Sequence, residues 1–150
     1  MKLASALSER SDLQRRISEL ETRLELNAKT QEGEKPAEDP KMLLAELDAD
    51  FERLEELITR INLTNSGTEV DGKPMTALLA KRDCLSKRLQ TMRYFLNRAS
   101  SKVERNSRTE IKIISTVDVA SLQKECDAYS RELRELDELI QSLNWTTELI

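Results

Sequence analysis

Apolar residues recur alternately three and four positions apart in four stretches of the chain. This spacing repeats every seven residues and places the apolar side chains along one side of an α-helix, in a stripe that we call a seam. The pattern therefore predicts four long helices. Their seams, in chain order, are Leu3, Ala6, Arg10, Leu13, Ile17, Leu20 and Leu24; Leu44, Leu47, Phe51, Leu54, Ile58 and Ile61; Leu78, Arg82, Leu85, Leu89, Met92, Leu96, Ala99 and Val103; and Val119, Leu122, Cys126, Tyr129, Leu133, Leu136, Ile140 and Leu143.

Further apolar residues lie beside the seams and widen them. They are Leu43, Leu57, Leu79, Phe95 and Leu139. A wide apolar stripe favours a packed bundle over a narrow two-stranded coil. We therefore predict a mainly α fold, an antiparallel four-helix bundle of long helices that forms a single domain over residues 1–150.

Turn-forming residues mark the connections between the predicted helices. Asp39 and Pro40 suit the N-cap and the first position of a helix. Asp71 and Gly72 are typical of a tight hairpin turn, because both residue types accept a positive φ. The β-branched stretch 109–117 predicts one short strand that pairs with this hairpin, in the same chain or in a neighbouring one. The inter-helix loops would then form a small β element.

The composition agrees with long helices and argues against catalysis. The 150 residues include 24 Lys and Arg, 28 Asp and Glu, 3 Gly, 3 Pro and no histidine. A chain so rich in charge and so poor in helix breakers is typical of long helices. The lack of histidine excludes Ser–His and Cys–His nucleophile pairs and histidine-ligated metals. We predict a non-enzyme with no catalytic site, no metal site and no cofactor.

The cysteines and the apolar runs bear on the cellular compartment. Cys84 and Cys126 match neither a disulfide framework nor a zinc-binding spacing, and we expect Cys84 to be exposed and Cys126 to fill a core. No run approaches the roughly 20 apolar residues that a membrane span needs. Charged Glu9 and Arg10 come too early for a signal peptide. We therefore expect a cytoplasmic protein with reduced thiols and no membrane partner.

Charge is distributed unevenly along the chain. Residues 38–60 have a net charge of −5, residues 81–112 of +7 and residues 113–150 of −5. One interpretation is charge complementarity between neighbouring antiparallel helices, which helps to select the topology. The other is a basic surface for nucleic acid or another polyanion. We favour complementarity and do not expect nucleic acid as a partner, because few aromatic residues lie among the basic ones.

Four residues are candidates for a contact or an anion site. Arg105, Arg108 and Lys112 lie where the third helix gives way to the predicted strand, and arginine suits bidentate capture of carboxylate or phosphate. They either pair with acidic side chains of neighbouring helices or contact a ligand or a second subunit. Trp145, the single tryptophan, either covers the end of its own bundle or docks on another subunit.

Several short segments together resemble the septicolysin-like family of largely uncharacterised bacterial proteins. The segments are Glu38-Asp39-Pro40, Ile58-Thr59-Arg60-Ile61-Asn62, Glu110-Ile111-Lys112, Thr116-Val117-Asp118-Val119 and the ending Asn144-Trp145-Thr146-Thr147-Glu148-Leu149. The resemblance covers nearly the whole chain and implies a bacterial, stand-alone domain. It supplies no catalytic residues. The family name implies a cytolytic toxin, but the sequence contains no secretion signal and no membrane-inserting hairpin.

These observations predict a non-enzymatic structural or interaction protein that self-associates through helix faces as a dimer or larger homo-oligomer. Apolar stripes wider than one bundle interior needs, and a strand with unpaired edges, both favour association. The alternative is a polyanion or nucleic-acid binding module that uses residues 81–112. A weaker alternative is a cytolysin, suggested by the family name only. A small-molecule ligand is unknown.

Overall fold

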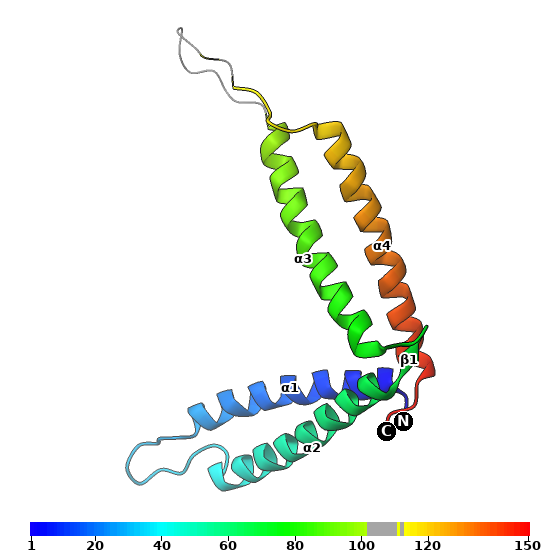
Figure 1. Ribbon diagram of the computed structural model, residues 1–150. Helices are drawn as coiled ribbons and strands as arrows, with labels where there is room; N and C mark the ends of the chain where they lie inside the picture. Colours follow the sequence, from blue (N-terminus) through cyan, green and yellow to red (C-terminus); the bar gives the residue numbers. More distant parts are fainter. Residues whose placement is uncertain (102–110, 112) are drawn as a thin grey trace. The chain divides into compact units, whose positions relative to one another are not determined.

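The computed structural model describes residues 1–101, 111 and 113–150. Within them lie four helices and one two-stranded antiparallel sheet (Figure 1). The prediction of a mainly α fold with four long helices and a small β element is confirmed. In chain order, the elements are α1 (Leu3–Leu26), α2 (Pro40–Gly67), β1 (Glu69–Val70), β2 (Lys73–Pro74), α3 (Met75–Ser100) and α4 (Val119–Thr146).

Side-chain caps begin two of the helices. The Asp39 carboxylate accepts a hydrogen bond from the Lys41 N–H at 3.0 Å, and Pro40 occupies the first position of α2, as predicted. Asp118 accepts from the Ser121 N–H at 3.2 Å in the same way before α4. Both caps satisfy N–H groups that have no partner inside the helix. The helix starts are therefore encoded locally.

The hairpin turn also forms where the sequence predicts it. Asp71 has a φ of 51° and Gly72 a φ of 74°, and Val70 pairs with Lys73 across the turn. Two consecutive positive φ angles match the twist of the flanking strands, and Asp-Gly is the residue pair best suited to them. The hairpin joins α2 to α3 (Figure 1).

The strand predicted at residues 109–117 is wrong for the part of it that the structure describes. Residues 113–117 have no strand pairing, and the side chains of Ile113 and Ile114 are exposed. A strand needs a partner for its backbone hydrogen bonds, and β1 pairs with β2 of its own hairpin. Residues 109, 110 and 112 lie outside the described residues, as does Val103 of the third predicted seam.

Contacts divide the chain into two compact units. Unit 1 comprises Met1–Met75 and Gln141–Ile150, and unit 2 comprises Thr76–Ile140. In unit 1, α1 and α2 lie side by side and antiparallel, and in unit 2 α3 lies antiparallel to most of α4 (Figure 1). Each unit has a core of its own. The single bundle domain over residues 1–150 stays a prediction.

The core of unit 2 lies along the seams predicted for α3 and α4. Leu89, Leu96 and Cys126 are buried together. Partly buried residues that pack against them are Met92, Val119, Leu122, Tyr129 and Leu133. Cys126 fills the core and Cys84 is exposed, as predicted.

In unit 1, the seam predicted for α1 is confirmed, but the one predicted for α2 is wrong at three of its six positions. Leu44 and Phe51 are each 48% exposed and Ile58 is 38% exposed, whereas their neighbours Leu43, Asp50 and Leu57 are buried. The remaining predicted positions, Leu47, Leu54 and Ile61, are half-buried or buried. Because three positions shift by one residue and three stay in place, the buried side of α2 is rotated by about half a residue, roughly 50°, from the prediction.

This rotation predicts unequal effects for two adjacent substitutions. Leu57→Ala removes a fully buried side chain and should lower the free energy of unfolding by about 2–5 kcal/mol. Ile58→Ala, the matched control next to it, should lower it by about 1 kcal/mol or less. Urea denaturation followed by circular dichroism measures both, at a protein concentration low enough that association between chains does not contribute to the stability. A larger loss for Ile58→Ala would contradict the observed rotation.

Candidate interaction surface

A buried carboxylate lies in the middle of the α2 core face. Asp50 is 2% exposed, and Arg16 of α1 donates from Nε to its Oδ2 at 2.6 Å and from Nη2 to its Oδ1. The Arg16 side chain is 62% exposed, so its guanidinium lies at the rim of the core. The hydrogen bonds to Asp50 raise the pKa of Arg16 above its ordinary value. Both carboxylate oxygens are thus satisfied, which allows the charge to be buried.

Other ion pairs cross from α1 to α2 on the same side of the core. Arg53 Nε lies 2.7 Å from Glu9 Oε1, and Arg23 Nη1 lies 3.9 Å from Glu46 Oε2. On α2, Glu46 comes one residue before Leu47, and Arg53 comes one residue before Leu54. Both charged residues therefore lie on the same side of the core. We call this side of the α1–α2 pair the ionic flank, defined by Arg16–Asp50, Arg53–Glu9 and Arg23–Glu46.

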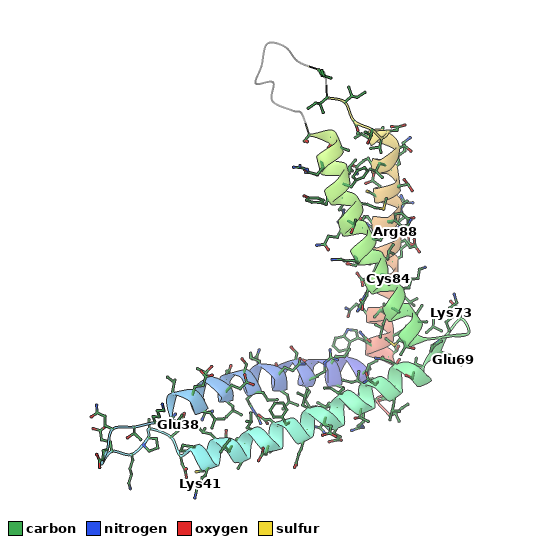
Figure 2. The ribbon with its side chains drawn as sticks, turned by 60° about the vertical axis from the view of Figure 1, so that its left-hand side comes forward. Glu38, Lys41, Glu69, Lys73, Cys84 and Arg88 are labelled. Atoms are coloured by element: carbon green, nitrogen blue, oxygen red, sulfur yellow. The ribbon has the colours of Figure 1, made fainter. Side chains whose placement is uncertain are left out.

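Two more contacts hold the ends of the ionic flank. Arg23 Nε donates to Glu38 Oε2 at 3.0 Å, which lowers the pKa of Glu38. Glu38 lies just before α2 (Figure 2), so this pair joins α1 to the start of the next helix. Arg53 also donates to Glu56 and thereby lowers the pKa of that carboxyl.

The opposite side of α2 carries exposed apolar residues. Leu44, Phe51 and Ile58 each follow a core residue by one position, which is a turn of about 100° around the helix in the direction away from the ionic flank. They recur every seventh residue along about 21 Å of helix. We call these three residues the α2 stripe. The sequence analysis predicted these three residues for the buried seam and placed Leu43 and Leu57 beside it. The structure shows the reverse, because Leu43 and Leu57 are buried and the three residues are exposed.

The residues singled out from the sequence lie elsewhere. Arg105, Arg108 and Lys112 lie outside the described residues. Trp145 lies in the last turn of α4 and is 65% exposed, so its indole does not seal the core of unit 1. Leu149, which is 7% exposed, lies buried in unit 1 instead. A contact of Trp145 with another subunit stays a prediction.

Sequence reasoning missed a contact between the two ends of the described chain. The Leu3 N–H donates to the Thr147 carbonyl at 2.9 Å, and the Leu149 N–H donates to the Met1 carbonyl at 2.8 Å. Figure 1 shows both ends side by side. We call this pairing the terminal clasp. It consists mostly of backbone hydrogen bonds between remote residues, so no local sequence pattern could have indicated it.

Side chains reinforce the terminal clasp. Glu148 lies 2.6 Å from Lys2 Nζ and 3.3 Å from the Met1 amino group, and these contacts lower its pKa. Arg60 Nε donates to the Ile150 carbonyl at 2.6 Å, and the Ile150 N–H donates to Thr64 Oγ1 at 3.0 Å. The clasp therefore also contacts the end of α2.

In unit 2, α3 carries the basic charge that the sequence analysis identified. Lys81 Nζ lies 2.8 Å from Glu132 Oε1 of α4, a contact of the kind that charge complementarity predicts. The Arg88 guanidinium lies 4.5 Å from the centre of the Tyr129 ring. Cys84 and Arg88 lie one turn apart on α3 (Figure 2). Lys87 and Arg98 are exposed.

The described residues offer little to reaction chemistry. In this part of the chain, no group of three or more His, Cys, Asp or Glu side chains could hold a metal ion. A shallow, open hollow on α2 is lined by Glu52, Glu55, Glu56, Thr59 and Arg60. Its lining comes from a single helix surface and supplies no nucleophile paired with a base. None of the described helices has the length and hydrophobicity to cross a membrane.

Comparison with known proteins gives relatives without an assigned function. The sequence model of DUF6847, a family of unknown function, matches residues 10–149. The chain is 42% identical to a protein from Corynebacterium diphtheriae whose crystal structure is described as that of a functionally unknown conserved protein. The match covers 100% of this chain and 99% of that chain with a TM-score of 0.93. No curated protein matches.

The resemblance to the septicolysin-like family is wrong. The matching family is a different one, and the similar structure carries no toxin description. Two of the segments that suggested it, around Asp39-Pro40 and Asp118-Val119, lie at helix starts, where capping chemistry alone favours such residues. Short matches of this kind identify helix ends and do not identify a family.

Substitutions of the two residues in the Arg16–Asp50 pair should have unequal effects on the free energy of unfolding. Arg16→Ala leaves the buried Asp50 carboxylate without its partner and should lower the free energy of unfolding. Asp50→Leu instead puts an apolar side chain in the core and leaves Arg16 in water, so it should be neutral or stabilising by about 1–4 kcal/mol. Chemical denaturation compares them, and equal losses would contradict this account.

The terminal clasp predicts a pH-dependent loss of stability. Because the pKa of Glu148 is lowered in the folded chain, its stabilising effect is present above pH 4.5, the ordinary glutamate value, and disappears as the pH falls through the lowered pKa. Glu148→Gln should therefore melt below the wild type at neutral pH, and the two should converge in acid. Thermal melts across pH measure this, with Glu25→Gln on α1 as the control. A gap between the two proteins that is independent of pH would contradict the assignment.

Proposed function

The chain belongs to DUF6847, a family of unknown function, and we propose that it is a non-enzymatic interaction protein that self-associates through helix faces. The α2 stripe is the observation that supports this proposal most directly. Single exposed apolar side chains are common on protein surfaces and need no explanation. Three of them at seven-residue spacing on one helix face are the pattern through which helices dock on one another.

The contrast between the two sides of α2 supports the same proposal. On the ionic flank, salt bridges to α1 occupy the charged side chains. On the side of the stripe, Leu44, Phe51 and Ile58 expose 48%, 48% and 38% of their surface to water. Burying apolar surface against another helix releases about 25 cal/mol per Å². A second copy of the chain is the partner that we propose.

Other features fit a protein of this kind. The chain has no histidine to serve as a general base at neutral pH. Cys84 and Cys126 are unpaired thiols, which fits the cytoplasmic location that we include in this proposal.

Binding of a polyanion by residues 81–112 is the second candidate. The exposed basic side chains Lys87 and Arg98 on α3 favour it. It ranks second because the chain has a net charge of −4 and because Lys81 is already paired with Glu132. Long-range attraction of a polyanion would be correspondingly weak.

The proposal predicts the mass in solution. Light scattering at micromolar concentration should give a mass of about twice the 17.2 kDa of one chain or more. The double variant Phe51→Gln with Ile58→Gln should return a mass near that of one chain, because amide groups on the stripe oppose its burial.

The matched control changes two exposed apolar residues of the same helix that lie off the stripe. Met42→Gln with Leu63→Gln, at positions 66% and 54% exposed, should leave the mass unchanged. A wild-type mass of one chain would overturn the proposed function. If the wild type associates and the double variant Phe51→Gln with Ile58→Gln keeps the same mass, the role proposed for α2 would be overturned.

A further inference from the structure

The α2 stripe is bordered by carboxylates, and this limits what can cover it. Asp48 and Glu55 follow Leu44 and Phe51 by four residues, one helical turn, and are exposed. Glu52 is exposed in the same stretch and lines the hollow on α2. If two copies of the stripe packed against each other, these carboxylates would face carboxylates. Like charges brought together at an interface oppose association.

The outer face of α3 has the opposite character. Between Met75 and Ser100 the chain has six basic residues and one acidic residue. Lys87, Tyr94 and Arg98 lie at spacings of seven and four, so they share one side of the helix. All three are exposed, Tyr94 by 71%, and Phe95 beside it is 46% exposed. We call this surface the α3 face, defined by Lys87, Tyr94, Phe95 and Arg98.

The contacts within unit 2 leave this face available. α3 is held to α4 by Lys81–Glu132, by Arg88 over the Tyr129 ring and by Arg93, which donates to Ser130 Oγ at 3.0 Å. Within the described residues, Lys87 and Arg98 take part in no ion pair.

From this complementarity we infer that the partner of the α2 stripe is the α3 face of a second copy of the chain. Aromatic rings of one copy cover Leu44, Phe51 and Ile58 of the other, and Lys87 and Arg98 lie opposite Asp48 and Glu55. Aromatic anchors surrounded by complementary charge are typical of specific interfaces. Each copy supplies one acidic and one basic face. The inference rests on the proposed self-association and names the two surfaces that carry it.

Charge reversal on each face tests the inference. One variant combines Asp48→Lys with Glu55→Lys, and the other combines Lys87→Glu with Arg98→Glu. Each variant alone should associate at least about tenfold more weakly than the wild type, because it sets like charges against each other where the two faces meet. An equimolar mixture of the two should associate again, because each reversed face then meets an opposite charge. Sedimentation equilibrium measures the three affinities, and circular dichroism verifies that each variant is folded.

Matched controls reverse the same number of charges elsewhere. Glu25→Lys with Glu34→Lys and Arg131→Glu with Arg134→Glu change exposed residues away from both faces and should keep the wild-type affinity to within about threefold, because none of these four side chains belongs to the proposed contact. A wild type that stays monomeric would overturn both the proposed function and this inference. An associated wild type whose face variants bind as tightly as it does, or whose mixture fails to recover, would overturn the inference and leave self-association standing.

Discussion

Asp50 can lie in the core of unit 1 only because Arg16 reaches across from α1 to meet it. An ion pair with one buried partner adds little net stability, since desolvation of the carboxylate offsets most of the attraction, but it favours one arrangement over others. The arrangement here is the rotation of α2 about its axis. Arg53–Glu9 and Arg23–Glu46 lie on the same flank and support the same rotation. With α2 held in this way, Leu43 and Leu57 face α1, and the α2 stripe faces outward.

The rotation gives the two sides of α2 different chemistry. One side is occupied by salt bridges within unit 1, and the other exposes apolar side chains bordered by Asp48 and Glu55. The α3 face in unit 2 presents aromatic and basic side chains. Surfaces of opposite charge that each carry apolar anchors suit recognition between proteins. The proposed self-association therefore rests on which charged side chains are paired within each unit and which are left exposed.

Unit 1 depends on residues from both ends of the chain. Its last part, Gln141–Ile150, comes after all of unit 2 in the sequence and closes on Met1 and Lys2 through the terminal clasp. Forming a contact between such remote residues costs more chain entropy than forming a contact within a helical hairpin. Several backbone hydrogen bonds and the Glu148 ion pairs offset this loss together. Trp145 is left exposed beside the clasp.

The sequence by itself determined the helices, the caps of α2 and α4 and the tight turn, because each depends on residues within a few positions: Asp39 caps α2, and Asp71-Gly72 supplies two positive φ angles. It could not choose the buried side of α2, because Leu43 with Leu57 and Leu44 with Ile58 fit a seven-residue repeat equally well. Hydrophobicity alone favoured Phe51 over Asp50 for the core. Only the tertiary structure reversed this choice, by placing Arg16 where it satisfies a carboxylate. It also decided the terminal clasp and the absence of a strand at residues 113–117, since backbone pairing depends on what lies opposite in space.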